Sequence, residues 1–303
     1  MNNEKISNSP GNNENINGSP KDGSLLVFLG ALFFSGSGTI QSYAPSEATA
    51  FILGALRLLA AGIFLIIWCC SKNLLQPLKN VNKFKVLLSA LALAGFQLSF
   101  FLGVRSAGVA VGTVVTIGTT PIMAAVFGLI FFKEIPQKSW YISTAIAIFG
   151  LVLLNIHGMN TFNISSILFP VLAGTIYAFY LSQSKELLQK VRPELIMMYL
   201  FILSSLILLP LWFIFPCAWV LTTRGMLIAI GLGVITTAIP YCLVMAGLKN
   251  CDTAKAATLS LGEPLGAAIL GFTLLHEPIN LMSFCGVIAI FTSVLVLIYT
   301  AKK

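Results

Sequence analysis

The feature that most constrains this chain is a series of ten long apolar runs separated by short connections. Each run can cross a hydrocarbon core of about 30 Å as an α-helix, which rises about 1.5 Å per residue. The runs extend over 25–43, 48–70, 85–103, 109–132, 140–156, 165–184, 195–215, 226–248, 253–275 and 281–300. We therefore predict an all-α integral membrane protein with ten transmembrane helices.

The composition favours the same class of protein. Hydrophobic residues make up 57% of the 303 residues and charged residues only 9%, against about 25% charged in soluble domains. A soluble protein of this size would expose much of that apolar surface to water, whereas lipid solvates it. Residues 1–23, rich in Asn, Gly and Ser, lack the apolar region of a signal peptide. They are predicted to form a disordered cytoplasmic tail.

The sequence gives no support to metal, cofactor or nucleic-acid chemistry. The six cysteines are scattered, mostly within apolar runs, and the two histidines, His157 and His276, lie far apart. No CxxC or HExxH spacing and no nucleophile with a nearby base occurs, so we predict no metal site, no cofactor and no enzymatic activity. The net charge of +8 comes from basic residues clustered between the apolar runs, a pattern typical of membrane topology and not of nucleic-acid binding.

The basic residues also predict the orientation of the chain. Of the 18 lysines and arginines, Arg105 and Arg224 fall on the side opposite the termini and Arg57 lies within a run, which leaves fifteen on the side of both termini. Because Lys and Arg collect on the cytoplasmic side of membrane proteins, we predict cytoplasmic N- and C-termini. The high Asn, Lys and Ile content favours a bacterial source and hence the plasma membrane.

The two halves of the chain share a pattern. Thr-Thr-Pro-Ile-Met-Ala-Ala around Pro121 matches Gly-Glu-Pro-Leu-Gly-Ala-Ala around Pro264, and the same offset of 143 positions relates Glu134 to Glu277. Each half holds five runs, so the second copy enters the membrane from the opposite side. We predict two inverted five-helix repeats, 24–157 and 158–303, which is the architecture of alternating-access carriers.

Several short motifs follow one another in order along the two halves, and the proline motif of the first half recurs in the second. They are Ser35-Gly36-Ser37-Gly38, Arg57 followed by Ala60-Ala61-Gly62, Pro121 followed by Glu134, and Glu263-Pro264 followed by Glu277. With these motifs the chain resembles the EamA-type branch of the drug/metabolite transporter superfamily over nearly all of its length after the tail. The resemblance implies a central cavity lined by the first, third, fourth, sixth, eighth and ninth helices. It also implies export or exchange of amino acids and related metabolites.

Two charged residues lie deep within predicted helices. Glu263 is about ten residues into the ninth run, where a carboxylate is costly unless it is paired or protonated. It is a candidate for substrate binding or proton coupling; the alternative is a structural group that braces the kink at Pro264. Arg57 is equally deep in the second run. It could pair with Glu263, attract an anionic group of the substrate, bond to backbone carbonyls, or extend toward the interface.

The remaining candidates are uncharged or lie at helix ends. Pro121 and Pro264 predict matched bends, either hinges or static kinks. Other candidates for substrate contact, which could instead form hydrogen bonds between or within helices, are Gln97, Thr116, Thr120, Tyr177 and Tyr241. Glu134 and Glu277 could each close a gate with a basic neighbour such as Lys133 or Lys138, or remain solvated.

Together these features predict a secondary transporter of small metabolites that works by alternating access. It would export or exchange amino acids or related compounds, with protons as the candidate coupling ion. The alternatives are an uptake permease of the same fold and a non-transporting membrane receptor or assembly factor. The predicted partners are a small-molecule substrate, the lipid bilayer and protons, and the predicted assembly is a monomer or a weak homo-oligomer.

Overall fold

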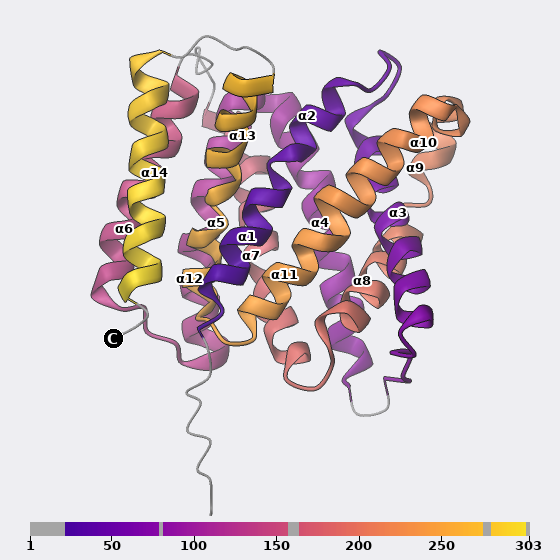
Figure 1. Cartoon of the computed structure of the whole chain (residues 1–303), viewed down its shortest axis with the longest axis horizontal. Helices are drawn as coiled ribbons and strands as arrows, with labels where there is room; N and C mark the ends of the chain where they lie inside the picture. Colours follow the sequence, from indigo (N-terminus) through magenta and orange to yellow (C-terminus); the bar gives the residue numbers. More distant parts are fainter. Residues whose placement is uncertain (1–21, 79–80, 157–163, 275–279, 301–303) are drawn as a thin grey trace, which may run out of the picture.

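The computed structural model describes residues 22–78, 81–156, 164–274 and 280–300 (Figure 1). Within these residues, ten helical segments are long and apolar enough to cross a membrane: Ser24–Ser42, Ala50–Ser71, Lys83–Ala107, Val109–Phe132, Lys138–Asn155, Ser165–Leu188, Pro193–Ile214, Thr223–Leu248, Thr253–Leu274 and Leu281–Thr300. The prediction of an all-α membrane protein with ten spans is confirmed.

Several spans consist of more than one helical segment. The first half contains α1 (Ser24–Phe34), α2 (Gly36–Ser42), α3 (Ala50–Ser71), α4 (Lys83–Ala107), α5 (Val109–Phe132) and α6 (Lys138–Asn155). The second half contains η2 (Ile164–Ile167), α7 (Leu168–Leu188), α8 (Pro193–Ile207), α9 (Leu211–Ile214), η3 (Ala218–Leu221), α10 (Thr223–Ile230), η4 (Gly231–Ala238), α11 (Ile239–Leu248), α12 (Thr253–Leu259), α13 (Gly262–Leu274) and α14 (Leu281–Thr300). The eighth span changes from α to π winding in η4, and the ninth span is interrupted between α12 and α13.

Local sequence explains where several helices begin and end. The Thr49 hydroxyl accepts from the backbone N–H of Ile52 at 3.3 Å, so it caps α3, and the Asn82 side chain caps α4. Gly108 separates α4 from α5 with a φ of 83°, a value that glycine adopts without strain. Lys133 ends α5 in the left-handed conformation with a φ of 57°.

The helices of the two halves pack against each other in reciprocal pairs. The third span of the first half packs against the first span of the second half (α4 against α7), and the reverse pair, α11 against α1, also forms. The fifth and tenth spans, α6 and α14, lie side by side at one end of the molecule in Figure 1, and α3 packs against α8. This reciprocity is the arrangement expected of two copies of one five-helix unit.

A glycine from each half allows the close contact between α6 and α14. A Cβ added at Gly150 would lie 2.8 Å from the carbonyl oxygen of Gly286, and one added at Gly286 would lie 2.7 Å from that of Gly150. Small residues are typical of helix interfaces in membranes, because they let backbones approach closely where lipid provides no hydrophobic driving force between helices.

Both described ends of the chain lie on one face of the molecule. Asp22, before α1, and Thr300, at the end of α14, line the same pocket. The connections that precede α6 and α12 line this pocket as well. We call this face, at the bottom of Figure 1, the terminal face. The chain therefore crosses the molecule an even number of times between these ends, as ten spans require.

Candidate functional site

Arg57 points from the middle of α3 toward the eighth span. Its Nε donates a hydrogen bond to the Thr237 hydroxyl at 2.9 Å, and its Nη2 donates to the backbone carbonyl of Thr236 at 3.2 Å. Both acceptors belong to η4, where π winding changes the normal pairing of backbone carbonyls. Arg57 remains partly exposed, so η4 holds the guanidinium without enclosing it.

Glu263 lies in the first turn of α13, directly after the interruption of the ninth span. Its side chain is partly exposed, and within the described residues no hydrogen bond or ion pair reaches its carboxylate. The direct pair with Arg57 that the sequence suggested does not form within 4.0 Å, although the two charges lie within electrostatic range of each other. Glu263 is thus a partly exposed acidic group without a hydrogen-bond or ion-pair partner among the described residues, within electrostatic range of an anchored cation.

Tyr177 and Tyr241 lie in the same interior region. Both phenols are within electrostatic range of Arg57 and Glu263. Tyr241 is buried, with its ring 4.9 Å from that of Phe34 and 5.3 Å from that of Phe201. Sequence reasoning missed Phe34 and Phe201, because an aromatic residue in an apolar run gives no signal of which face it occupies.

Tyr177 extends this aromatic wall toward α4. Its ring lies 4.8 Å from the ring of Phe96 and 5.7 Å from that of Tyr180. The structure therefore brings together four of the predicted site residues from four helices: Arg57 from α3, Tyr177 from α7, Tyr241 from α11 and Glu263 from α13. Such a set combines two opposite charges with aromatic walls, which suits a small amphipathic or zwitterionic molecule.

The other polar candidates form hydrogen bonds between helices or within their own helix. Thr116 donates to the carbonyl of Pro170 at 3.1 Å, and Thr120 donates to the carbonyl of Thr116 at 2.9 Å. Gln97 donates to the carbonyl of Gly54 at 3.3 Å. All three side chains are buried, and none contacts the group around Arg57 and Glu263 by a hydrogen bond.

The two prolines that match in sequence differ in structure. Pro121 lies inside the continuous helix α5, whereas Pro264 lies in the first turn of α13. Proline is tolerated at the start of a helix because the first N–H groups have no partner there. The ninth span therefore accommodates its proline by starting a new helix, and the fourth span does so within one helix.

A second charged group lies at the terminal face. Glu134 forms an ion pair with Lys185, and its other carboxylate oxygen accepts a hydrogen bond from the backbone N–H of Thr253 at 2.8 Å. Of the two alternatives for Glu134, neither a pair with Lys133 or Lys138 nor a solvated carboxylate is found, because the fold brings Lys185 of α7 to the end of α5. Glu277 and both histidines lie outside the described residues.

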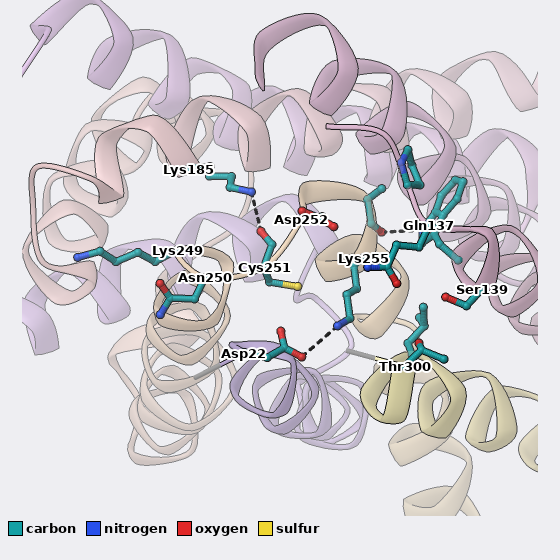
Figure 2. Close-up of a pocket in the computed structure, with 14 residues that line it drawn as sticks. Asp22, Gln137, Ser139, Lys185, Lys249, Asn250, Cys251, Asp252, Lys255 and Thr300 are labelled. Carbon is teal, nitrogen blue, oxygen red and sulfur yellow. Dashed lines mark hydrogen bonds and ion pairs between the residues drawn. The ribbon is translucent and has the colours of Figure 1, made fainter. Parts of the chain in front are cut away.

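Beside this group is a pocket with a volume of about 360 Å³ (Figure 2). It is lined mainly by polar and charged side chains from five parts of the chain. They include Asp22, Gln137, Lys185, Lys249, Asn250, Asp252 and Lys255. Lys255 pairs with Asp22 at 3.0 Å across the pocket.

The ten spans, the deep charges and the reciprocal halves define a polytopic helical membrane protein of the transporter class. Two segments, 21–156 and 164–299, match the EamA-like transporter family. The chain belongs to this family, as the resemblance in its motifs predicted.

Relatives and a solved structure agree with this assignment. The chain is 33% identical over 287 residues to the uncharacterized transporter YwfM of Bacillus subtilis (strain 168), covering 92% of this chain and 95% of YwfM. It is 26% identical over 297 residues to the uncharacterized inner membrane transporter YicL of Salmonella typhimurium, covering 94% and 98%. A crystal structure with 18% identity covers 94% of this chain and 99% of its own, with a TM-score of 0.81, and supports the fold.

Proposed function

We propose that this chain is a secondary transporter that exports or exchanges amino acids or related small zwitterionic metabolites by alternating access. The observation that carries the proposal is the partly exposed carboxylate of Glu263, which has no partner among the described residues and lies within electrostatic range of the anchored guanidinium of Arg57. A substrate with an amine and a carboxylate is complementary to these two charges. The aromatic rings of Tyr177 and Tyr241 supply apolar walls beside them.

The depth of Glu263 supports proton coupling. A charged carboxylate far from both membrane surfaces costs free energy, which either protonation or an ammonium group of the substrate removes. Proton and substrate would then compete for one carboxylate, so that binding of one releases the other. This competition couples their movements without any further ion site, and it makes an exchanger of protons and substrate the expected mode.

The orientation and location are part of the proposal. We assign the terminal face to the cytoplasm, because the order of the spans predicts that fifteen of the 18 lysines and arginines lie on the side of the termini. We place the protein in the plasma membrane as a monomer or weak homo-oligomer. The reciprocal packing of the halves supports rocking of one half against the other about the group around Arg57 and Glu263.

The test is flux in proteoliposomes that contain the purified full-length protein. Vesicles preloaded with a mixture of unlabelled amino acids should accumulate labelled amino acids by exchange, and an imposed pH gradient should change the rate. Vesicles without protein provide the background. If no amino acid moves with or without the gradient, the proposed substrate class fails.

Two alternatives predict different results in the same vesicles. An uptake permease would accumulate substrate toward the terminal face under the same gradient, so sealed vesicles of known orientation separate it from an exporter. A receptor or assembly factor would bind ligand without any flux. The two opposite charges within the spans favour transport over the receptor, because a receptor has no need of an unpartnered carboxylate inside a span.

A further inference from the structure

Glu134 ties the two halves together at the terminal face. It follows the last turn of α5, and its carboxylate contacts both Lys185 at the end of α7 and the backbone N–H of Thr253 at the start of α12. Lys185 also donates to the carbonyl oxygen of Cys251 at 2.6 Å. We call these four residues the Glu134 latch. Both side chains of its ion pair are largely buried, with 11% and 16% of their surfaces exposed, so it is less screened than a surface pair.

The latch supplies a cap that the local sequence would be expected to provide. Asp252 occupies the N-cap position of α12 with an extended backbone (φ −64°, ψ 144°), the conformation that capping residues adopt. Its side chain nevertheless makes no capping hydrogen bond. Instead, the carboxylate of Glu134, which follows α5 in the other half, accepts the hydrogen bond from the Thr253 N–H at the α12 N-terminus. Two carboxylates are therefore available to one helix N-terminus.

The charged form of Asp252 is destabilised by the position of Glu134 at the same helix N-terminus. Burial raises the pKa of the Asp252 carboxyl, and the nearby negative charge of Glu134 raises it further, against the opposing effect of Lys185 and Lys255. The charged form of Asp252 is thus disfavoured while Glu134 holds the helix. Withdrawal of Glu134 would remove this repulsion and leave the N-terminal N–H groups of α12 to Asp252.

The pocket of Figure 2 lies directly at this latch. Lys185 and Asp252 line it on one side, and the Asp22–Lys255 ion pair lines it on the other. Its volume of about 360 Å³ is within the range of small-molecule sites. Its lining presents both signs of charge, which favours a zwitterion over an anion or a cation.

We propose that this pocket is the entrance through which small zwitterionic substrates reach the interior from the terminal face, that the Glu134 latch closes it, and that Asp252 caps α12 when the latch opens. The inference rests on the proposed function for its substrate class. The exchange of caps keeps the N-terminus of α12 satisfied in both states, which lowers the free energy of opening. Asp252 is a positioning residue in this scheme, because it acts through α12.

A native cysteine reports on the latch. Cys251 is buried, and burial raises the pKa of its thiol to about 12, so it reacts slowly with a maleimide while the latch is closed. Cys70 is exposed at the end of α3 and serves as a reference within the same molecule. The ratio of labelling at Cys251 to labelling at Cys70, measured by peptide mass spectrometry of the full-length protein, reports opening.

The variants separate the latch from the alternative cap. Glu134→Gln and Lys185→Gln each break the ion pair and should raise the labelling ratio about fivefold or more. In the Glu134→Gln background, Asp252→Ala should reverse the increase, whereas Asp252→Asn should preserve it, because Asn caps helices as well as Asp does and Ala does not. Glu186→Gln is the control, since it breaks a more exposed ion pair with Lys85 on the same face.

The labelling ratios test the latch, the exchange of caps and the entrance separately. An unchanged ratio in both Glu134→Gln and Lys185→Gln overturns the latch, and equal ratios for Asp252→Ala and Asp252→Asn overturn the exchange of caps. A mixture of neutral amino acids should raise the wild-type ratio about twofold, and equal concentrations of acetate and methylamine should not. If the amino acids and the mixture of acetate and methylamine change the ratio equally, the pocket is not the entrance for zwitterionic substrates. The labelling of the variants needs no substrate, so absence of flux in proteoliposomes would refute the proposed function and leave the latch standing.

Discussion

The fourth and ninth spans carry the same proline motif but use it differently. In α5, Thr120 precedes Pro121; its buried hydroxyl bonds to the carbonyl of Thr116, and the helix continues. In the ninth span, Glu263 precedes Pro264; its carboxylate has no partner among the described residues, and a new helix begins there. The polar side chain before the proline is thus hydrogen-bonded in the fourth span, whereas in the ninth span it has no partner among the described residues. The repeat thus supplies a common scaffold, while the function is expected to depend on the second copy.

A substitution at the available group should have the largest effect. Glu263→Gln keeps the size of the side chain but removes its charge and its proton, so proton-dependent flux should fall at least about tenfold, as expected for loss of a charged contact. Flux in proteoliposomes with an imposed pH gradient measures this. Thr120→Val at the matched position is the control. The comparison fails if both variants reduce flux equally, or if Glu263→Gln retains the wild-type dependence on pH.

Substitution of Arg57 tests whether its guanidinium stabilises the π-wound segment η4. Arg57→Gln shortens the side chain and leaves the carbonyl of Thr236 without its charged donor, which should cost about 1–3 kcal/mol of stability and also reduce exchange. Thermal unfolding in detergent and flux measure the two effects. Arg224→Gln is the matched control, because Arg224 donates to the carbonyl of Tyr43 at 2.8 Å at an exposed position. Equal losses in the two variants would contradict a special role for Arg57.

The two prolines should respond in opposite ways to alanine. Pro121→Ala restores an N–H inside α5 and should raise stability by about 1 kcal/mol, less than the ~3 kcal/mol of a soluble helix because neighbours in membranes satisfy the freed groups. Pro264→Ala should leave stability unchanged, because the first turn of α13 has no hydrogen bond to regain. Melting temperatures of both variants provide the measurement. Equal shifts would mean that the two spans handle their prolines alike.

The sequence predicts the spans well because length and hydropathy determine them without reference to neighbours. The fourth span was predicted as Val109–Phe132 and is observed as such, and the third extends past its predicted end to Ala107. The difference between Pro121 and Pro264 has no such signal, because it depends on what surrounds each helix. The same is true of Glu134, whose partner Lys185 is 51 positions away and is adjacent only after folding.

The site was predictable to the extent that burial of charge is costly. Glu263 and Arg57 stand out in any apolar run, and the structure places them within electrostatic range of each other. Hydroxyl and amide groups do not stand out in this way, since a threonine serves equally well in a cavity wall or between helices. The contacts of Thr116 with Pro170, of Thr120 with Gly174 and of Gln97 with Gly54 therefore required the packing of α5 on α7 and of α4 on α3 to be known.

The smallest effect should come from the satisfied copy of the motif. Thr120→Val removes a hydroxyl that bonds to the carbonyl of Thr116 at 2.9 Å and approaches that of Gly174 in α7 at 3.5 Å. Hydrogen bonds between membrane helices contribute about 0.6 kcal/mol on average, so the loss in stability should be of that order. Thr273→Val is the control, because that hydroxyl bonds to its own helix at an exposed position. If flux in Thr120→Val falls about tenfold while stability changes only by this amount, Thr120, like Glu263, takes part in transport. The two copies of the motif would then be functionally alike.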